Sequence, residues 1–113
     1  SLLFSPLQLN SPRGPLTLPN RIVVAPMCQY ACHLDGKAND WHLMHWANLL
    51  NSGASVFMIE ATAVTAQGRI TPNCLGLWDD ATSNALADTL ARARKLAPPT
   101  AVCLQIAHAG RKA

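Results

Sequence analysis

Polar side chains that could do chemistry follow three separate apolar runs of the chain. Cys28 and Tyr30 come just after the first run, Glu60 after the second, and Gln105 with His108 at the end of the third. A thiol, a phenol, a carboxyl, a carboxamide and an imidazole together supply hydrogen-bond donors, acceptors and titratable groups. One ligand site could use all of them if the three runs end at the same edge of a sheet.

Gln105 is the most informative of these residues, because it stands inside a run of Val, Leu and Ile. A carboxamide is costly to bury unless its donor and its acceptor both find partners. Gln105 therefore needs a ligand or a network, and an amide that donates and accepts at once suits the alternating N–H and C=O edge of a flavin pyrimidine. On residue type alone, a glutamine bonded to neighbouring backbone is an equally good interpretation.

The other candidate residues each have a plainer interpretation. Cys28 could lie near a cofactor ring, but a free cysteine is more often a small buried hydrophobic residue. Tyr30 could donate to a substrate through its hydroxyl, although most tyrosines simply pack with that hydroxyl at the surface. We expect Glu60 to pair with a base rather than to act as one, and His108 near Arg111 suits hydrogen bonding or an anion.

Several histidines and cysteines raise the question of a metal site: Cys28, Cys32, His33, His42 and His45. His42 and His45 fall one helical turn apart, but the Cys-x3-Cys-His segment has no matching second half, so the spacing is weak support for zinc. We predict no metal ion. His42 and His45 are expected on a helix surface or as satisfied core residues.

Three apolar runs separated by two helical patterns indicate a parallel α/β fold. The runs Ile22–Ala25, Val56–Ile59 and Ala101–Ile106 are short and continuous, which is typical of strands buried on both faces. The order β-α-β-α-β implies parallel strands with right-handed crossovers. In such folds ligands bind where the strands end, so the three polar exits are expected at one edge.

Capping residues mark both expected helices. Asn39 or Asp40 can cap a helix that runs from Trp41 to about Leu50, and Asp79 can cap a second helix that stops before Pro98. The apolar face of the first helix is made of Leu43, Met44, Trp46, Ala47 and Leu50. The buried stripe of the second is made of Leu86, Leu90, Ala93 and Ala97. Before the first strand, residues 4–19 are broken by a turn at 11–15, which predicts a two-stranded flap that serves as a lid or plug.

The composition argues against several classes of protein. The 113 residues are 50% hydrophobic and only 13% charged, and the net charge of +3 is not gathered in the long basic run that nucleic-acid binding needs. No apolar run approaches the roughly 20 residues of a membrane-spanning helix, and no signal peptide opens the chain. We therefore expect a cytoplasmic protein whose four cysteines are free thiols.

Three ordered blocks, spread over the whole chain, resemble the old yellow enzyme family. They are residues 20–30 (NRIVVAPMCQY), residues 60–71 (EATAV and QGRIT around Thr65 and Ala66) and residues 105–113 (QIAHAGRKA). Cys28 directly after Pro26 and Met27 is similar to the xenobiotic-reductase or thermophilic-like branch of that family. The resemblance implies the N-terminal part, about three β-α units with a flap, of a TIM (β/α)8 barrel.

The resemblance also implies an activity and its cofactors. A flavin oxidoreductase of this family holds FMN, takes hydride from NADPH or NADH, and delivers it from flavin N5 to the β-carbon of an activated alkene such as an enone, enal, maleimide or nitro compound. It implies flavin contacts by Ala25, Pro26, Met27, Cys28, Ala61 and Gln105. Cys28 would lie near N5 and O4, and Tyr30 would face the substrate. Ala25 stands where many relatives have serine.

The resemblance further implies that residues 1–113 are an incomplete part of one barrel domain. The substrate-anchoring histidines, the proton-donating tyrosine and the loops that bind the FMN phosphate are expected beyond residue 113, since a complete barrel takes about 250 residues. The remaining barrel segment, in the same or a companion chain, is thus an expected partner, and the complete protein is expected to be a homo-oligomer. The alternative is a non-catalytic truncated or split fragment that acts only as an assembly module with the remaining barrel.

Overall fold

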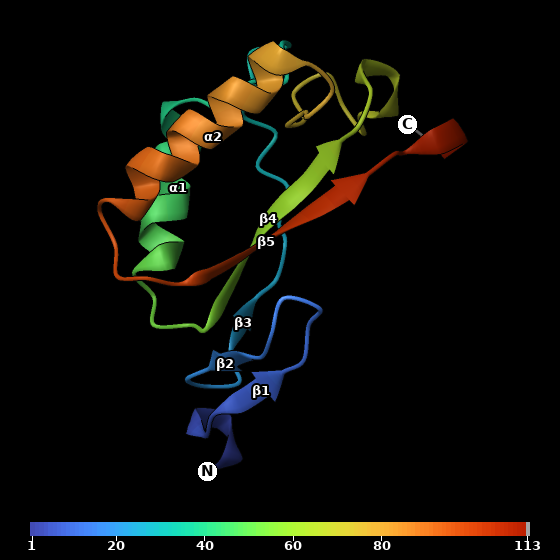
Figure 1. The fold of residues 1–113 in the computed structure, drawn as a ribbon. Helices are drawn as coiled ribbons and strands as arrows, with labels where there is room; N and C mark the ends of the chain where they lie inside the picture. Colours follow the sequence, from blue (N-terminus) through green and yellow to red (C-terminus); the bar gives the residue numbers. More distant parts are fainter. Residues whose placement is uncertain (113) are drawn as a thin grey trace.

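A two-stranded flap precedes a three-stranded parallel sheet with two helices in the computed structural model, which describes residues 1–112 (Figure 1). The flap strands are β1 (Leu7–Leu9) and β2 (Leu16–Leu18), and the sheet strands are β3 (Val23–Val24), β4 (Val56–Ala63) and β5 (Ala101–Ala107). The helices are α1 (Asp40–Leu50) and α2 (Asp80–Arg94), with single 3-10 turns at Leu2–Phe4, Ala66–Gly68 and Gly110–Lys112. Ala113, the last residue of the third matching block, lies outside the described residues.

The predicted parallel topology is confirmed. The sheet order is β3-β4-β5, with Val24 of β3 opposite Phe57 of β4 and Phe57 opposite Val102 of β5. Each crossover between neighbouring strands carries one helix, as parallel strands require. The carboxyl ends of all three strands therefore point the same way (Figure 1).

The prediction that every strand is buried on both faces is wrong for this chain. Both helices lie on the same face of the sheet (Figure 1), and the side chains that turn toward them are buried, with Phe57 2% and Ile59 1% exposed. On the other face, Val23 of β3 is 50% exposed, and Cys103 and Gln105 of β5 are exposed, because nothing in residues 1–112 covers that face. Only the central strand β4 meets the expectation.

The predicted caps form as expected. The Asn39 carboxamide oxygen accepts the Trp41 N–H at 2.9 Å at the start of α1, and an Asp79 carboxylate oxygen accepts the Thr82 N–H at 2.8 Å at the start of α2. Each bond satisfies one of the backbone donors that a helix start leaves free. Three residues after α1 ends, Gly53 adopts a left-handed φ of +89°, which reverses the chain into β4.

The core lies between the two helices and the sheet. Its buried residues are Cys32, Ala38, Trp46, Leu50, Phe57, Ile59, Leu75 and Ala93, with Leu43, Ala47, Leu86, Leu90 and Ala97 packed against them. Both predicted helix stripes therefore pack as expected, with the exception of Met44, which is 55% exposed. Met44 lies two residues from Trp46, about 200° around the helix, so the two side chains cannot both face the core.

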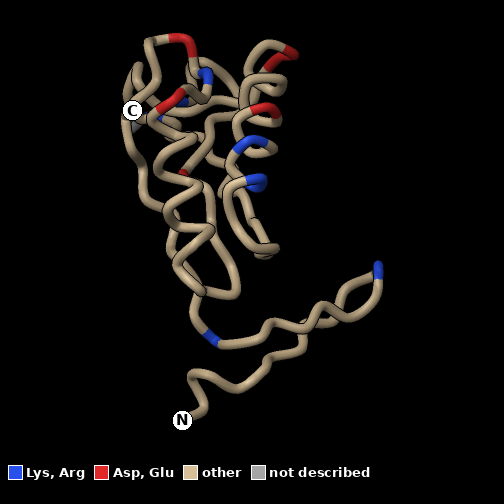
Figure 2. The backbone as a smooth tube through the Cα atoms, turned by 90° about the vertical axis from the view of Figure 1, so that its left-hand side faces the viewer, with Lys and Arg blue, Asp and Glu red and all other residues tan. Residues whose placement is uncertain are grey.

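The flap lies at the amino ends of the sheet strands, opposite the strand exits (Figure 1). Residues 16–19 and the segments that lead into β4 and β5 line a common cavity of about 420 Å3 there. Asn20 joins the two parts, since its backbone N–H donates to Ser55 Oγ at 2.8 Å. Figure 2 shows the flap reaching away from the body of the molecule. Most of the Lys, Arg, Asp and Glu residues lie in that body rather than in the flap. This position excludes a lid over the strand exits and leaves the plug interpretation.

Candidate functional site

Backbone hydrogen bonds and one carboxylate tie the three strand exits into a single edge. The Gln29 N–H, in the turn after β3, donates to a Glu60 carboxylate oxygen of β4 at 3.2 Å. The Val64 N–H, just after β4, donates to the Ala107 carbonyl of β5 at 3.2 Å. Candidate residues that are far apart in the sequence therefore share one side of the molecule.

A β-bulge lies at the point where β4 and β5 carry their candidate residues. Ile59 pairs with Leu104 and Thr62 with Ile106, so Glu60 and Ala61 of β4 together lie opposite the single residue Gln105. An extra residue on one strand re-aims the neighbouring side chains, and bulges are common next to active sites. Here Glu60 is buried beside α1, whereas Ala61 keeps part of its surface and Gln105 is exposed.

The premise that Gln105 is buried is wrong within residues 1–112, where this side chain is exposed. The cause is that no element covers that face of β5. The remaining candidates at the first exit are also accessible, because Ala25, Met27 and Tyr30 are exposed and Pro26 and Cys28 are half-buried.

Tyr30 is held in an unusual backbone conformation. Its φ is +52°, in the left-handed region that non-glycine residues rarely adopt and that costs on the order of 1 kcal/mol. The loop that follows is fastened to the loop after β4, where the Asn73 amide donates to the Cys32 carbonyl at 2.7 Å and the Cys32 N–H donates to the Asn73 carbonyl at 3.1 Å. Arg69 adds a bond to the Leu34 carbonyl at 3.1 Å. These bonds hold the backbone of the segment that directly follows Tyr30.

Cys28 sits in a setting that favours its thiol form. Burial, and next the neighbouring Glu60 carboxyl, raise the pKa of the Cys28 thiol above its ordinary value. All four cysteines are free, as predicted. A neutral thiol at this exit can donate a weak hydrogen bond but is a poor nucleophile.

Glu60 and His42 form a buried pair behind the exits. His42 Nε2 lies 3.8 Å from Glu60 Oε1, and the two side chains are 0% and 2% exposed. Burial lowers the pKa of His42 to about 4 and raises that of Glu60. His42 is thus a core residue, one of the two settings predicted for it. The base predicted to pair with Glu60 is present, but Glu60 Oε1 makes no hydrogen bond to His42 within the described residues. Within residues 1–112, no group of three or more His, Cys, Asp or Glu side chains is placed to hold a metal ion.

The sequence analysis did not predict the close packing of Arg69, Gly36 and Gly76 around the Trp78 ring, which we call the Trp78 clamp. The Arg69 guanidinium lies 5.3 Å from the centre of a Trp78 ring, which makes a cation–π contact. Gly36 and Gly76 lie so close to this ring that an added Cβ would stand 2.3 Å and 2.1 Å from it. Gly76 alone gave a signal, since it stands between Leu75 and Leu77 without a turn partner, whereas Gly36 follows Asp35 and is explained by a turn.

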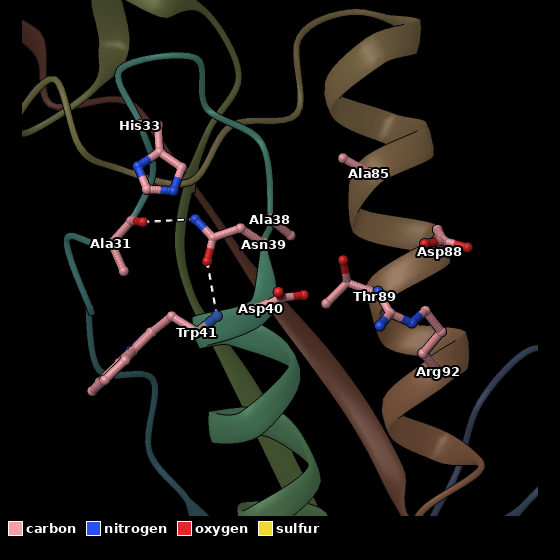
Figure 3. A pocket seen from close by; sticks show the side chains of 10 residues that line it. All are labelled: Ala31, His33, Ala38, Asn39, Asp40, Trp41, Ala85, Asp88, Thr89 and Arg92. Carbon is pink, nitrogen blue, oxygen red and sulfur yellow. Dashed lines mark hydrogen bonds between the residues drawn. The ribbon is translucent and has the colours of Figure 1, made fainter.

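A cavity of about 650 Å3 lies elsewhere, between the start of α1 and the middle of α2 (Figure 3). Asn39 anchors its rim, with its amide nitrogen on the Ala31 carbonyl at 2.7 Å. Its lining residues are Ala31, His33, Ala38, Asn39, Asp40, Trp41, Ala85, Asp88, Thr89 and Arg92. None of the predicted site residues is among them, so the cavity is a groove in the helical layer and not part of the strand-exit site.

Membrane insertion through a helix has no support in residues 1–112. None of the helices there has the length and apolar character that a membrane crossing requires.

Comparison with known proteins identifies the family. The model of the NADH:flavin oxidoreductase / NADH oxidase family matches residues 2–113. A NADPH dehydrogenase of Bacillus licheniformis is 44% identical over 112 residues, covering 98% of this chain and 31% of the relative, and a NADH:flavin oxidoreductase of Gibberella zeae is 41% identical over 111 residues, covering 98% and 25%. The chain thus spans about a third or less of the length of these curated relatives.

Solved structures give the same answer for the fold. Morphinone reductase superposes with a TM-score of 0.80 at 26% identity, over 98% of this chain and 27% of that protein. Old Yellow Enzyme from Pichia sp. superposes with a TM-score of 0.84 at 21% identity, over 100% and 28%, which supports the fold alone. The predicted resemblance to the old yellow enzyme family is confirmed, and the names of the family and its relatives agree with the expected flavin and nicotinamide cofactors. The chain belongs to the NADH:flavin oxidoreductase / NADH oxidase family and folds as an N-terminal part of its TIM barrel.

Proposed function

We propose that the chain forms the ring-facing part of an FMN-dependent ene reductase that uses NADPH or NADH and acts on enones, enals, maleimides and nitro compounds. The observation that carries this proposal is the single edge formed by the three strand exits, where the bulge sets Ala61 opposite Gln105. The relatives' names support the nicotinamide and flavin chemistry. A structure of morphinone reductase holds tetrahydroNAD, and that protein is 26% identical to this chain.

The residues at the exits fit a flavin ring. Ala61 is small and leaves room beside the exposed Gln105 amide, which can donate to and accept from the N–H and C=O groups of a pyrimidine edge. The contacts would come from Ala25, Pro26, Met27, Cys28, Ala61 and Gln105. When bound, FMN supplies the hydride relay between the nicotinamide and the alkene. The role of Cys28 would be to present a neutral S–H toward the ring.

Tyr30 is proposed to face the substrate. It is 48% exposed and its backbone is held by the loop after β4, so its hydroxyl can be presented in a fixed direction. The proton donor is proposed to come from the rest of the barrel, and residues 1–113 are proposed to be a segment of that single domain. The free cysteines support a reducing, cytoplasmic location. A homo-oligomer is proposed for the complete barrel.

Reconstitution with the remaining barrel tests this function. We expect the assembled protein to show flavin absorbance and to oxidise NADPH when 2-cyclohexenone is added. Gln105→Leu should weaken FMN binding about tenfold, because one or two hydrogen bonds worth about 1 kcal/mol each are lost. Asp88→Asn, an exposed side chain on α2, is the control and should bind FMN normally. A completed barrel that binds no flavin would refute the proposal.

A non-catalytic assembly module is the second candidate. The observation in its favour is the uncovered face of the sheet, where Val23 and Cys103 are exposed. Chain association through this face, without flavin, would give a defined oligomer in size-exclusion chromatography and a cooperative melt by circular dichroism. Flavin binding that depends on Gln105 would favour the enzyme instead.

A further inference from the structure

Glu60 is a buried carboxyl that the proposed flavin contacts leave unused. Glu60 is 3% exposed, and its Oε1 has no hydrogen-bond partner within the described part of the chain. Leaving a buried acceptor without a partner costs about 1–3 kcal/mol, and more for a charged group. A hydrophobic residue at this position of β4 would avoid that cost, so the carboxyl calls for a reason beyond packing.

One carboxylate oxygen of Glu60 holds the turn that carries the candidate residues. Oε2 accepts the Gln29 N–H at 3.2 Å, and Gln29 stands between Cys28 and Tyr30. The Gln29 side chain extends the same turn, because its amide donates to the Met27 carbonyl at 2.9 Å and its oxygen accepts the Trp41 indole N–H at 3.1 Å. The position of the Cys28 thiol thus depends on a bond to Glu60.

The other oxygen of Glu60 faces His42, whose tautomer is set by the backbone. His42 Nδ1 accepts the Asn39 N–H at 3.1 Å, so this nitrogen carries no proton and the neutral ring must carry its hydrogen on Nε2. Nε2 lies 3.8 Å from Glu60 Oε1 and 4.0 Å from Cys32 Sγ. The Nε2–H of His42 therefore lies near the unpartnered Glu60 Oε1, and the bond from the Asn39 N–H at the start of α1 fixes the tautomer of the ring.

We propose that Glu60 is a positioning residue of the flavin-facing turn: its carboxyl, between the Gln29 amide and the His42 imidazole, holds Cys28 in place and imposes a negative field on it. This inference rests on the proposed function and adds a role for a residue behind the ring. The negative field of Glu60 keeps Cys28 in its neutral thiol form. A neutral Cys28 adds no second negative charge to a site that would gain one when a flavin is reduced. His42 is neutral at pH 7, so it does not cancel the negative charge of the Glu60 carboxylate.

Other titratable groups also face this turn. Cys28 is faced by Glu60 from β4, by Cys74 from the loop after β4 and by Tyr30 of its own turn. His33 and His45 act on His42, and Asp35 and Arg69 act on Cys32, which lies beside His42. Among the groups that face Cys28, Glu60 is the only carboxyl, and a carboxyl is ordinarily far more acidic than a thiol or a phenol, so replacing Glu60 isolates the field.

Glu60→Gln tests the field by the pH dependence of Cys28 alkylation. Iodoacetamide labelling of the full chain, read for each cysteine by mass spectrometry, should show Cys28 reacting severalfold faster near neutral pH in this variant, with its profile moved to lower pH. Buried Cys74 should stay protected, which separates loss of the field from loosening of the turn. Asp88→Asn, an exposed carboxyl on α2, is the matched control and should leave the profile unchanged. An unchanged Cys28 profile in a folded Glu60→Gln protein would overturn the proposal.

A measurement on the unaltered chain covers the case in which the variant does not fold. 15N–1H correlation spectra should find His42 as the Nε2–H tautomer and neutral down to about pH 4. A proton on Nδ1, or a cationic His42 at pH 6, would also overturn the proposal. Both measurements can be made without flavin. Failure to bind FMN would therefore refute the proposed function, whereas the role of Glu60 would still be decided by cysteine labelling and the His42 tautomer.

Discussion

The two faces of the sheet differ sharply although the same strands build both. On the helix side, Phe57 and Ile59 are almost fully buried, whereas on the other side Gln105 and Cys103 are exposed. Burial on the helix side supplies most of the stability, at about 25 cal/mol for each Å2 of apolar surface. The open face and the strand exits contribute little to stability, and they carry the candidate chemistry. Stability and function are therefore separable in this chain.

Trp46→Ala should produce the largest loss of stability. The side chain is 0% exposed in the core between α1 and the sheet, and truncating a buried tryptophan costs about 3–5 kcal/mol. Urea denaturation followed by far-UV circular dichroism measures the change. A loss below about 1 kcal/mol would contradict the claim that the helix side holds the fold together.

Acid should destabilise the chain through His42. The pKa of buried His42 is lowered to about 4, so between pH 6.5 and 4 the unfolded chain binds a proton that the folded chain does not. Stability is thus complete above pH 6.5 and falls as pH decreases, by roughly 3 kcal/mol from this residue. Glu60, whose raised pKa favours proton binding by the folded chain, works in the opposite direction and reduces the net loss.

A pair of variants separates His42 from its neighbour. His42→Gln should flatten the dependence of unfolding free energy on pH between 6.5 and 4, at the cost of lower stability at pH 7. His45→Gln, one turn away on the same helix and only partly buried, should keep most of the slope. Equal slopes in the two variants would mean that the Glu60–His42 pair is not the acid-sensitive element.

The sequence predicts the helix side of this molecule far better than the exits. Helix caps and stripes are local patterns, so Asn39, Asp79 and the Trp46 stripe could be placed from spacing alone. Two residues that were expected to be buried are exposed. Met44 lies on the side of α1 that faces away from the core, and Gln105 lies on a face of β5 that no other element covers. Periodicity reports that a residue is apolar, and it does not report which element will cover it.

The residues behind the site were harder to predict, because their contacts join distant segments. Glu60 could be expected to meet a base, but nothing local indicates that the base is His42, which α1 carries across the sheet. The bulge that divides Glu60 from Ala61 also has no glycine or proline to mark it. The family motifs predict a flavin site at the exits, and they say nothing about the buried pair that lies behind them.

Gly76→Ala should have an intermediate effect. An added Cβ would stand 2.1 Å from the Trp78 ring, and that ring is pinned by Arg69, so repacking should cost about 1–3 kcal/mol. Gly68→Ala is the comparison variant and should cost less, since its new Cβ would stand 2.7 Å from the exposed His108 ring, which is held by a single hydrogen bond from the Gly110 N–H. The same denaturation measurement compares the two variants. A larger loss for Gly68→Ala would contradict the clamp.

Cys103→Ser should have the smallest effect and is the most direct test of the difference between the faces. Cys103 lies on β5 directly opposite Met58 and is exposed, so exchanging its sulfur for a hydroxyl should change the unfolding free energy by less than about 0.5 kcal/mol. That result is expected only while the open face stays uncovered. Once the rest of a barrel, or a second copy of the chain, closes over β5, the hydroxyl is buried and the same substitution should cost about 1–3 kcal/mol. Measuring the variant with and without the missing barrel therefore asks whether this face is the inside of the assembled protein, and an equal cost in both forms would show that it is not.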